Sequence, residues 1–148
     1  GEMNAKALTR TSDASLQKCG VSKQKLSYLR DLSRHAELNL VLFEKLQDLG
    51  DDEIIVHLTK VRGVGRWTAQ MFLLFQLGSP DILSELDLGI QKGIQVLYKR
   101  KELPKPKEVL DISLTWAPYR TVASWYLWRA VDLSREKSKP SATQPRKS

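Results

Sequence analysis

The sequence predicts an all-α fold, and two observations lead to that prediction. Apolar residues recur at three- to four-residue spacing along most of the chain, as they do on the buried face of an α-helix. Alternating apolar stretches bounded by Asn-Gly or Asp-Gly turns, which would indicate β-hairpins, do not occur in the sequence. With 148 residues, 41% hydrophobic and 28% charged, the chain has the length and composition of one globular domain.

Cap residues mark the start of several predicted helices, and a glycine lies at or just after the end of three of them, at Gly20, Gly50 and Gly78. In chain order they cover residues 13–18, 23–36, 40–49, 51–58, 66–77, 87–98, 107–116 and 118–133. Ser12 or Asp13 caps the first of these helices and Ser22 caps the second. The segment 66–77 is apolar nearly all round, so we expect it to be fully buried. Pro118 is expected in the first turn of the last helix.

The helical pattern divides the chain into three parts. Residues 1–12 are polar and predicted to be loose, residues 13–133 form the helical domain, and residues 134–148 are predicted to be a disordered basic tail. This tail carries four of the seven net positive charges of the chain. The basic composition is therefore weak evidence for a nucleic-acid partner of the folded part.

Several classes of site are excluded by composition. The single cysteine, Cys19, excludes an intramolecular disulfide, a CxxC zinc site and an all-cysteine iron–sulfur cluster. The longest strongly apolar run is about a dozen residues, which is too short to span a bilayer. His35 and His57 fall on no motif and are interpreted as solvated or helix-face residues. We expect no cofactor and no metal held by side chains.

The most informative segment is the turn Arg62-Gly63-Val64-Gly65, which no helix favours in its interior. Glycine can adopt positive φ and has no Cβ, so the amides of such a turn can face a phosphate. The positive N-terminal end of the helix that begins at Arg66 adds to the same place. Leu58, Val61 and Val64 are expected to face inward. The same glycines also suit an ordinary helix–helix corner.

This turn is the first of three motifs that resemble one family. It is followed by Gly78-Ser79-Pro80 and then by Asp87, in the order found in the helix–hairpin–helix (HhH-GPD) superfamily of DNA glycosylases. The segments 116–121 and 125–128 are similar to the C-terminal helix of the 3-methyladenine DNA glycosylase II branch. The resemblance runs from about Asp13 to Leu133 and implies the helical glycosylase fold. That fold has further helices before the point where this sequence begins, so we expect an N-terminally incomplete domain.

The resemblance also implies the roles of individual residues. Asp87 matches the catalytic aspartate, although without the family context a plain helix N-cap is the favoured interpretation. The residues implied to line the base pocket are Trp67, Leu88 and Tyr119. Those implied to contact DNA are Arg62, Gly63, Val64, Gly65, Arg66 and Thr68. Core packing is an open alternative for Trp67, and it is our interpretation of Trp125 and Trp128.

Two further expectations concern the hairpin. Bifunctional members of the superfamily carry a lysine two residues after the second hairpin glycine, where it forms a Schiff base. Trp67 occupies that position here, and the guanidinium of Arg66 does not deprotonate to replace the lysine, so we expect a monofunctional enzyme. Family hairpins often hold a monovalent cation on backbone carbonyls, which correspond to those of Thr59, Val61 and Val64.

Two functional hypotheses follow. In the first, the chain is a monofunctional glycosylase that hydrolyses the N-glycosidic bond of alkylated purines of the 3-methyladenine type in base excision repair. Its partner is then double-stranded DNA containing alkylated bases, and we expect a monomer without membrane association. In the second, it is a non-catalytic or truncated helix–hairpin–helix DNA-binding protein. A DNA substrate implies the nucleus or a DNA-containing organelle in a eukaryote, and otherwise the cytoplasm.

Overall fold

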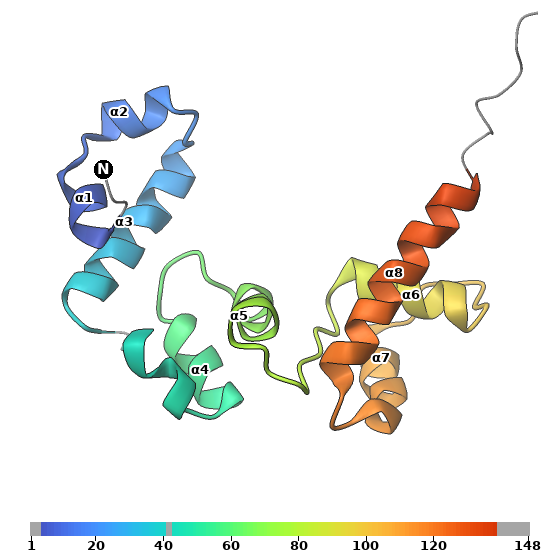
Figure 1. Ribbon diagram of the computed structural model, residues 1–148. Helices are drawn as coiled ribbons and strands as arrows, with labels where there is room; N and C mark the ends of the chain where they lie inside the picture. Colours follow the sequence, from blue (N-terminus) through green and yellow to red (C-terminus); the bar gives the residue numbers. More distant parts are fainter. Residues whose placement is uncertain (1–3, 41–42, 139–148) are drawn as a thin grey trace, which may run out of the picture. The chain divides into compact units, whose positions relative to one another are not determined.

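A computed structural model describes residues 4–40 and 43–138, and over these residues the structure is all-helical, which confirms the predicted fold class (Figure 1). The chain forms two compact units, Gly1–Gly78 and Ser79–Ser148. Within the described ranges, no helix is both long enough and apolar enough to cross a membrane.

The first unit contains five α-helices and two irregular helical segments within its described residues. The α-helices are α1 (Ala5–Arg10), α2 (Asp13–Lys18), α3 (Lys23–Glu37), α4 (Asp51–Leu58) and α5 (Arg66–Phe72). A 3₁₀ helix, Phe43–Asp48, precedes α4, and a π-helical turn, Leu73–Leu77, continues α5. The caps of α2 and α3 were predicted correctly: the hydroxyls of Ser12 and Ser22 accept the amides of Ser15 and Lys25.

Helix α1 shows that the prediction of a loose segment 1–12 is wrong for residues 5–10. The Asn4 side chain caps the helix by accepting the Ala7 amide at 2.9 Å. The Arg30 guanidinium of α3 donates to the carbonyls of Leu8 and Thr11 at the other end of α1. A tertiary contact from α3 thus satisfies carbonyls that a short isolated helix leaves exposed. Residues 1–3 lie outside the described residues.

The expectation that segment 66–77 is fully buried is also wrong. Ala69, Gln70, Leu73 and Leu74 are buried, but the side chains of Trp67 and Phe75 are 49% and 58% exposed. Hydrophobic character around the whole segment therefore does not mean that every side is covered. Only one side of this helical segment packs inward.

The second unit begins with a loop, residues 79–87, and continues with three α-helices. These are α6 (Leu88–Leu97), α7 (Pro106–Ser113) and α8 (Arg120–Ser138), with a 3₁₀ turn, Leu114–Trp116, after α7. Helix α8 begins two residues after Pro118, which is therefore not in its first turn. It continues to Ser138, so the predicted disordered tail is wrong for residues 134–138, and residues 139–148 lie outside the described residues.

Helices α6 and α8 form the main contact of the second unit (Figure 1). Gly93 of α6 is buried, and a Cβ on this residue would lie 2.6 Å from both the Cβ and the carbonyl oxygen of Leu127. The absence of a side chain therefore allows the two backbones to approach closely. Around this contact lies a buried apolar cluster of Leu83, Ile90, Ile94, Val109 and Leu127.

The loop before α6 is attached to the first turn of α8 by a polar network. The Arg120 guanidinium binds the Asp81 carboxylate through two hydrogen bonds of 2.6 Å. The Thr121 hydroxyl donates to the Ser79 carbonyl at 2.6 Å and accepts the Ile82 amide at 2.9 Å. This network fixes the path of the chain from Ser79 to Ile82, ahead of Asp87.

Candidate functional site

The hairpin lies between α4 and α5 and has the inward-facing residues that its sequence predicts. Leu58 and Val61 are buried and Val64 is half-buried, whereas Arg62, Gly63 and Gly65 are exposed. Gly63 has the predicted positive φ, +86°. Gly65 has a φ of −88°, which any residue can adopt. The conformation of the turn therefore requires glycine only at position 63.

The hydrogen bonds of the turn divide its amides into two groups. The Val64 amide donates to the Val61 carbonyl at 3.0 Å, and the Arg62 amide donates to Asp31 Oδ2 on α3 at 2.7 Å. Within the described part of the chain, the Gly63 and Gly65 amides have no acceptor. Both of these glycines are exposed, so the turn presents two amide donors to an external acceptor.

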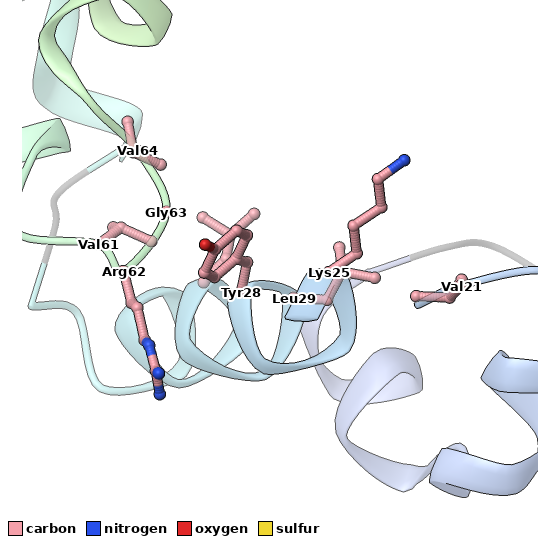
Figure 2. Close-up of a pocket in the computed structure, with 9 residues that line it drawn as sticks. Val21, Lys25, Tyr28, Leu29, Val61, Arg62, Gly63 and Val64 are labelled. Carbon is pink, nitrogen blue, oxygen red and sulfur yellow. The ribbon is translucent and has the colours of Figure 1, made fainter. Parts of the chain in front are cut away.

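Helix α3 packs against the hairpin. Figure 2 shows Tyr28 extending from α3 towards Gly63, and a Cβ on Gly63 would lie 2.4 Å from Tyr28 Cγ. Beside this contact is a pocket of about 270 Å³ whose walls are mainly apolar. Its lining includes Val21, Leu29, Leu32, Val61 and Val64, together with the cationic residues Lys25 and Arg62.

Val61 is one of three residues whose backbone carbonyls are expected to hold a monovalent cation. The Val61 carbonyl accepts the Val64 amide, and a carbonyl oxygen retains a second lone pair for an ion. The cation itself remains a prediction, as does its coordination by the carbonyls of Thr59, Val61 and Val64. No group of three or more His, Cys, Asp or Glu side chains suited to a metal ion occurs among residues 4–40 and 43–138.

Asp87 is the N-cap of α6, and its carboxylate has a second partner that the sequence did not predict. Its Oδ1 accepts the Ile90 amide at 2.9 Å, which is the ordinary capping bond. The same oxygen accepts the indole Nε1–H of Trp128 from α8 at 3.0 Å. The carboxylate is thus oriented by two donors from two helices, and the capping role and a catalytic role are compatible.

Gly89 makes the contact between Asp87 and Trp128 possible. A Cβ on Gly89 would lie 2.7 Å from Trp128 Cδ1 and 2.9 Å from Asp87 Oδ1. Gly89 and Gly93 are four residues apart and so lie on the same face of α6. This spacing is a sequence signal of close helix packing, and it could have indicated that an α8 side chain reaches Asp87.

The interpretation of the two tryptophans of α8 as core residues needs correction. Trp125 is 51% exposed, so it is not a core residue. Trp128 is partly buried and packs against the apolar cluster, but it also binds Asp87. The two rings are in edge contact, with centroids 5.7 Å apart and planes at 84°. Their three-residue spacing predicts that the two rings lie on one face of α8, which is confirmed by their contact. Whether that face is buried depends on tertiary packing.

The remaining predicted site residues are all exposed. Arg66, Trp67 and Thr68 occupy the first turn of α5 in the first unit. Leu88, the first residue of α6, is 52% exposed, and Tyr119, directly before α8, is 64% exposed. The structure therefore groups the predicted DNA contacts and Trp67 in the first unit. It groups Asp87, Leu88 and Tyr119 in the second.

Tyr119 is followed by the ion pair that attaches α8 to the loop. The hydrogen bond from the Arg120 guanidinium holds the pKa of Asp81 below its ordinary value, against the opposing effect of partial burial. The same bond raises the pKa of Arg120. Both groups are therefore charged at neutral pH, and Tyr119 is positioned by an ion pair in which Arg120 donates through both its backbone amide and its guanidinium.

The chain is similar in sequence and in fold to known 3-methyladenine glycosylases. The chain is 34% identical to DNA-3-methyladenine glycosylase 1 of Schizosaccharomyces pombe over 120 residues, which are 80% of this chain and 53% of that protein. The crystal structure of a DNA-3-methyladenine glycosidase from Bacillus halodurans matches with a TM-score of 0.83 and 38% identity, covering 92% of this chain and 63% of that chain.

A second solved structure is that of S. pombe 3-methyladenine DNA glycosylase in complex with abasic DNA. It matches with a TM-score of 0.79 and 31% identity and covers 85% of this chain and 62% of that chain. The sequence thus spans about half to two thirds of the length of these relatives. A sequence profile described as HhH-GPD superfamily base excision DNA repair protein matches residues 1–118. The chain therefore belongs to the HhH-GPD superfamily of base excision DNA repair proteins.

Proposed function

We propose that this chain carries the catalytic and DNA-binding parts of a monofunctional DNA glycosylase that hydrolyses the N-glycosidic bond of alkylated purines of the 3-methyladenine type. The observation that carries the proposal is the Asp87 carboxylate, which is held by the Ile90 amide and the Trp128 indole in a member of a base excision repair superfamily. Its relatives and structural neighbours are named as 3-methyladenine glycosylases.

The proposed reaction needs a fixed anion near the sugar. The C1′–N bond breaks and the cationic alkylated base leaves with the electron pair, which makes the base neutral and leaves C1′ with oxocarbenium character. The Asp87 carboxylate stabilises this positive charge electrostatically. Water then bonds to C1′ and loses a proton, for which the same carboxylate is the proposed acceptor. Because the base is already cationic, a strong general acid is less necessary.

The base itself requires a pocket outside the duplex. An enzyme of this kind extrudes the target nucleotide, at a cost of a few kcal/mol, and holds the base by stacking. Leu88, the residue after Asp87, and Tyr119, directly before α8, are proposed pocket residues, and their exposure leaves them available for this contact. Trp67 is proposed as a pocket residue on the family resemblance. An electron-rich aromatic ring suits a cationic base through cation–π attraction.

The hairpin is the proposed site of duplex binding. Its exposed Gly63 and Gly65 amides are donors for a backbone phosphate, and the exposed side chains of Arg62, Arg66 and Thr68 lie around them. Contacts of this kind position the protein on the duplex without selecting a sequence. We propose that the protein acts on double-stranded DNA as a monomer. In a eukaryote that DNA is in the nucleus or in an organelle.

The proposal is tested by measuring the release of 3-methyladenine and 7-methylguanine from methylated duplex DNA. The full chain is expected to release base, and Asp87→Asn is expected to lose at least about 100-fold in rate because the anion is gone. Asparagine is a good N-cap, so this variant should keep the fold. Asp111→Asn, which changes an exposed carboxylate of α7, is the matched control and should retain the parent rate.

Two outcomes contradict the proposal. Binding of duplex DNA without base release would favour the second hypothesis, a non-catalytic helix–hairpin–helix DNA-binding protein. Release of base by Asp87→Asn at the parent rate would show that Asp87 is not the catalytic residue.

A further inference from the structure

We propose that Asp31 of α3 is a positioning residue for DNA binding: through the Arg62 amide, its carboxylate holds the hairpin in the shape that presents Gly63 and Gly65 to a phosphate. The inference rests on the proposed function of the hairpin and adds a residue that lies outside the hairpin motif. Asp31 precedes Arg62 by 31 residues in the sequence.

The first support for this role is the contact itself. Asp31 Oδ2 accepts the Arg62 amide at 2.7 Å, and hydrogen bonds to an ionised acceptor are stronger than neutral ones. The Asp31 side chain is 23% exposed, and its Oδ2 also lies 3.4 Å from His35 Nδ1 on the next turn of α3. This bond occupies the first amide of the turn, so that Gly63 and Gly65 provide the outward donors.

The second support comes from Tyr28, three residues earlier and on the same face of α3. Its ring packs directly against Gly63, where a Cβ would lie 2.4 Å from Cγ (Figure 2). Its hydroxyl accepts the Gln24 side-chain amide at 2.8 Å, which orients the ring. One face of α3 thus fixes two consecutive residues of the turn, one by a hydrogen bond and one by packing.

Because Asp31 is negatively charged, the direction of the change in DNA affinity on its removal tests the proposal. A carboxylate close to a phosphate-binding turn repels the phosphate, so by charge alone its removal should strengthen DNA binding. If Asp31 positions the turn, its removal should instead weaken binding, because the Gly63 and Gly65 amides lose their common orientation. The two accounts therefore predict opposite changes in affinity.

The experiment measures the affinity of the full chain and its variants for an undamaged duplex at fixed salt. Asp31→Ala is expected to weaken binding about tenfold, the effect of losing one strong hydrogen bond. Asp31→Asn retains an acceptor and should stay within about threefold of the parent. Asp31→Glu keeps the charge and helix propensity but displaces the acceptor, and it should also weaken binding. Glu37→Ala removes an exposed charge from the same helix and should bind at least as tightly as the parent.

A second readout tests the positioning without DNA. Hydrogen exchange of the Arg62 amide, measured by NMR in the free protein, should accelerate about tenfold in Asp31→Ala and Asp31→Glu but not in Asp31→Asn or Glu37→Ala. If the parent does not bind duplex DNA, the proposed function fails, and unchanged exchange at Arg62 would separately overturn the positioning role. Duplex binding by Asp31→Ala and Asp31→Glu that equals or exceeds the parent's would also overturn it. If Asp31→Ala fails to fold, duplex binding and Arg62 amide exchange in Asp31→Glu decide between the two accounts.

Discussion

The two glycines of the hairpin are glycine for different physical reasons. Gly63 has a φ of +86° and packs against the Tyr28 ring, so the fold itself excludes a side chain there. Gly65 has an ordinary extended backbone, and apart from its two chain neighbours no atom of the described residues lies within 4 Å of a Cβ built on it. The absence of a side chain at position 65 therefore points to the approach of something outside the chain.

This difference predicts two separable effects. Gly63→Ala should lower the free energy of unfolding by about 2 to 3 kcal/mol, because it combines backbone strain with overpacking. Gly65→Ala should change it by less than about 1 kcal/mol, the scale of a helix N-cap exchange. Gly65→Ala should nevertheless weaken binding of every duplex about tenfold, since its methyl group stands between the amides and the phosphate. Urea denaturation and binding titrations measure the two effects. Unchanged binding by Gly65→Ala, or a loss for one DNA sequence alone, would contradict phosphate contact at this turn.

Asp87 illustrates how far sequence reasoning reaches at a single residue. The helix cap is a local feature, and the position of Asp87 ahead of an apolar helix was sufficient to predict it. The bond from Trp128 joins residues 41 apart in the sequence and depends on the missing side chain of Gly89. Apolar periodicity predicts which face of a helix is buried. It does not predict which acceptor the indole N–H of a buried tryptophan will bind.

At the scale of helices, the N-terminal caps were predicted better than the buried faces. Ser12, Ser22 and Asp87 cap the helices for which they were proposed, because a cap depends on residues within one turn. Helix α1 was missed because Asn4 and the distant Arg30 satisfy its two ends while none of its residues is buried. The exposure of Trp67, Phe75 and Trp125 was missed because it depends on which side of each helix is covered.

The junction of the 79–82 loop with α8 predicts a pH dependence of stability. The hydrogen bond from Arg120 lowers the pKa of Asp81 in the folded protein, so the unfolded chain binds the proton more tightly. The stabilisation is therefore complete above the pKa of an unfolded aspartate, about 3.9. It is lost as the pH falls through the lower pKa of the folded state. Glu108 contributes in the same direction, because the Lys105 amide and the Arg100 guanidinium lower its pKa.

We therefore expect the urea midpoint of the parent to fall as the pH is lowered below about 4. Asp81→Asn should be less stable than the parent at pH 7, since it leaves the Arg120 guanidinium without its ion-pair partner. Its midpoint should then depend less on pH between about 4 and 2, with Glu108 accounting for part of the remaining slope. Asp111→Asn, an exposed carboxylate on α7, should follow the parent curve. A parallel pH dependence of the parent and Asp81→Asn would show that this ion pair does not set acid stability.

At the scale of the whole molecule, the charge is unevenly distributed along the sequence. The chain carries 24 Lys and Arg against 17 Asp and Glu, and residues 139–148 contain three of the cations and no acidic residue. Binding to duplex DNA by such cations releases counterions, whereas binding by backbone amides such as those of Gly63 and Gly65 does not. The salt dependence of affinity can therefore separate the two contributions, which a single dissociation constant combines.

A variant with Lys139, Arg146 and Lys147 replaced by glutamine should bind undamaged duplex more weakly and with a shallower salt dependence. Each phosphate contact that is lost reduces the slope of log affinity against log salt by about 0.9, so a change of up to about 3 is expected. Gly65→Ala should instead lower affinity by the same factor at every salt concentration and keep the parent slope, because an amide contact carries no counterion. Titrations between about 50 and 200 mM salt measure both slopes. If the triple variant keeps the salt slope of the parent, these three cations do not contact DNA, and Lys and Arg residues before position 139 account for the electrostatic part of binding.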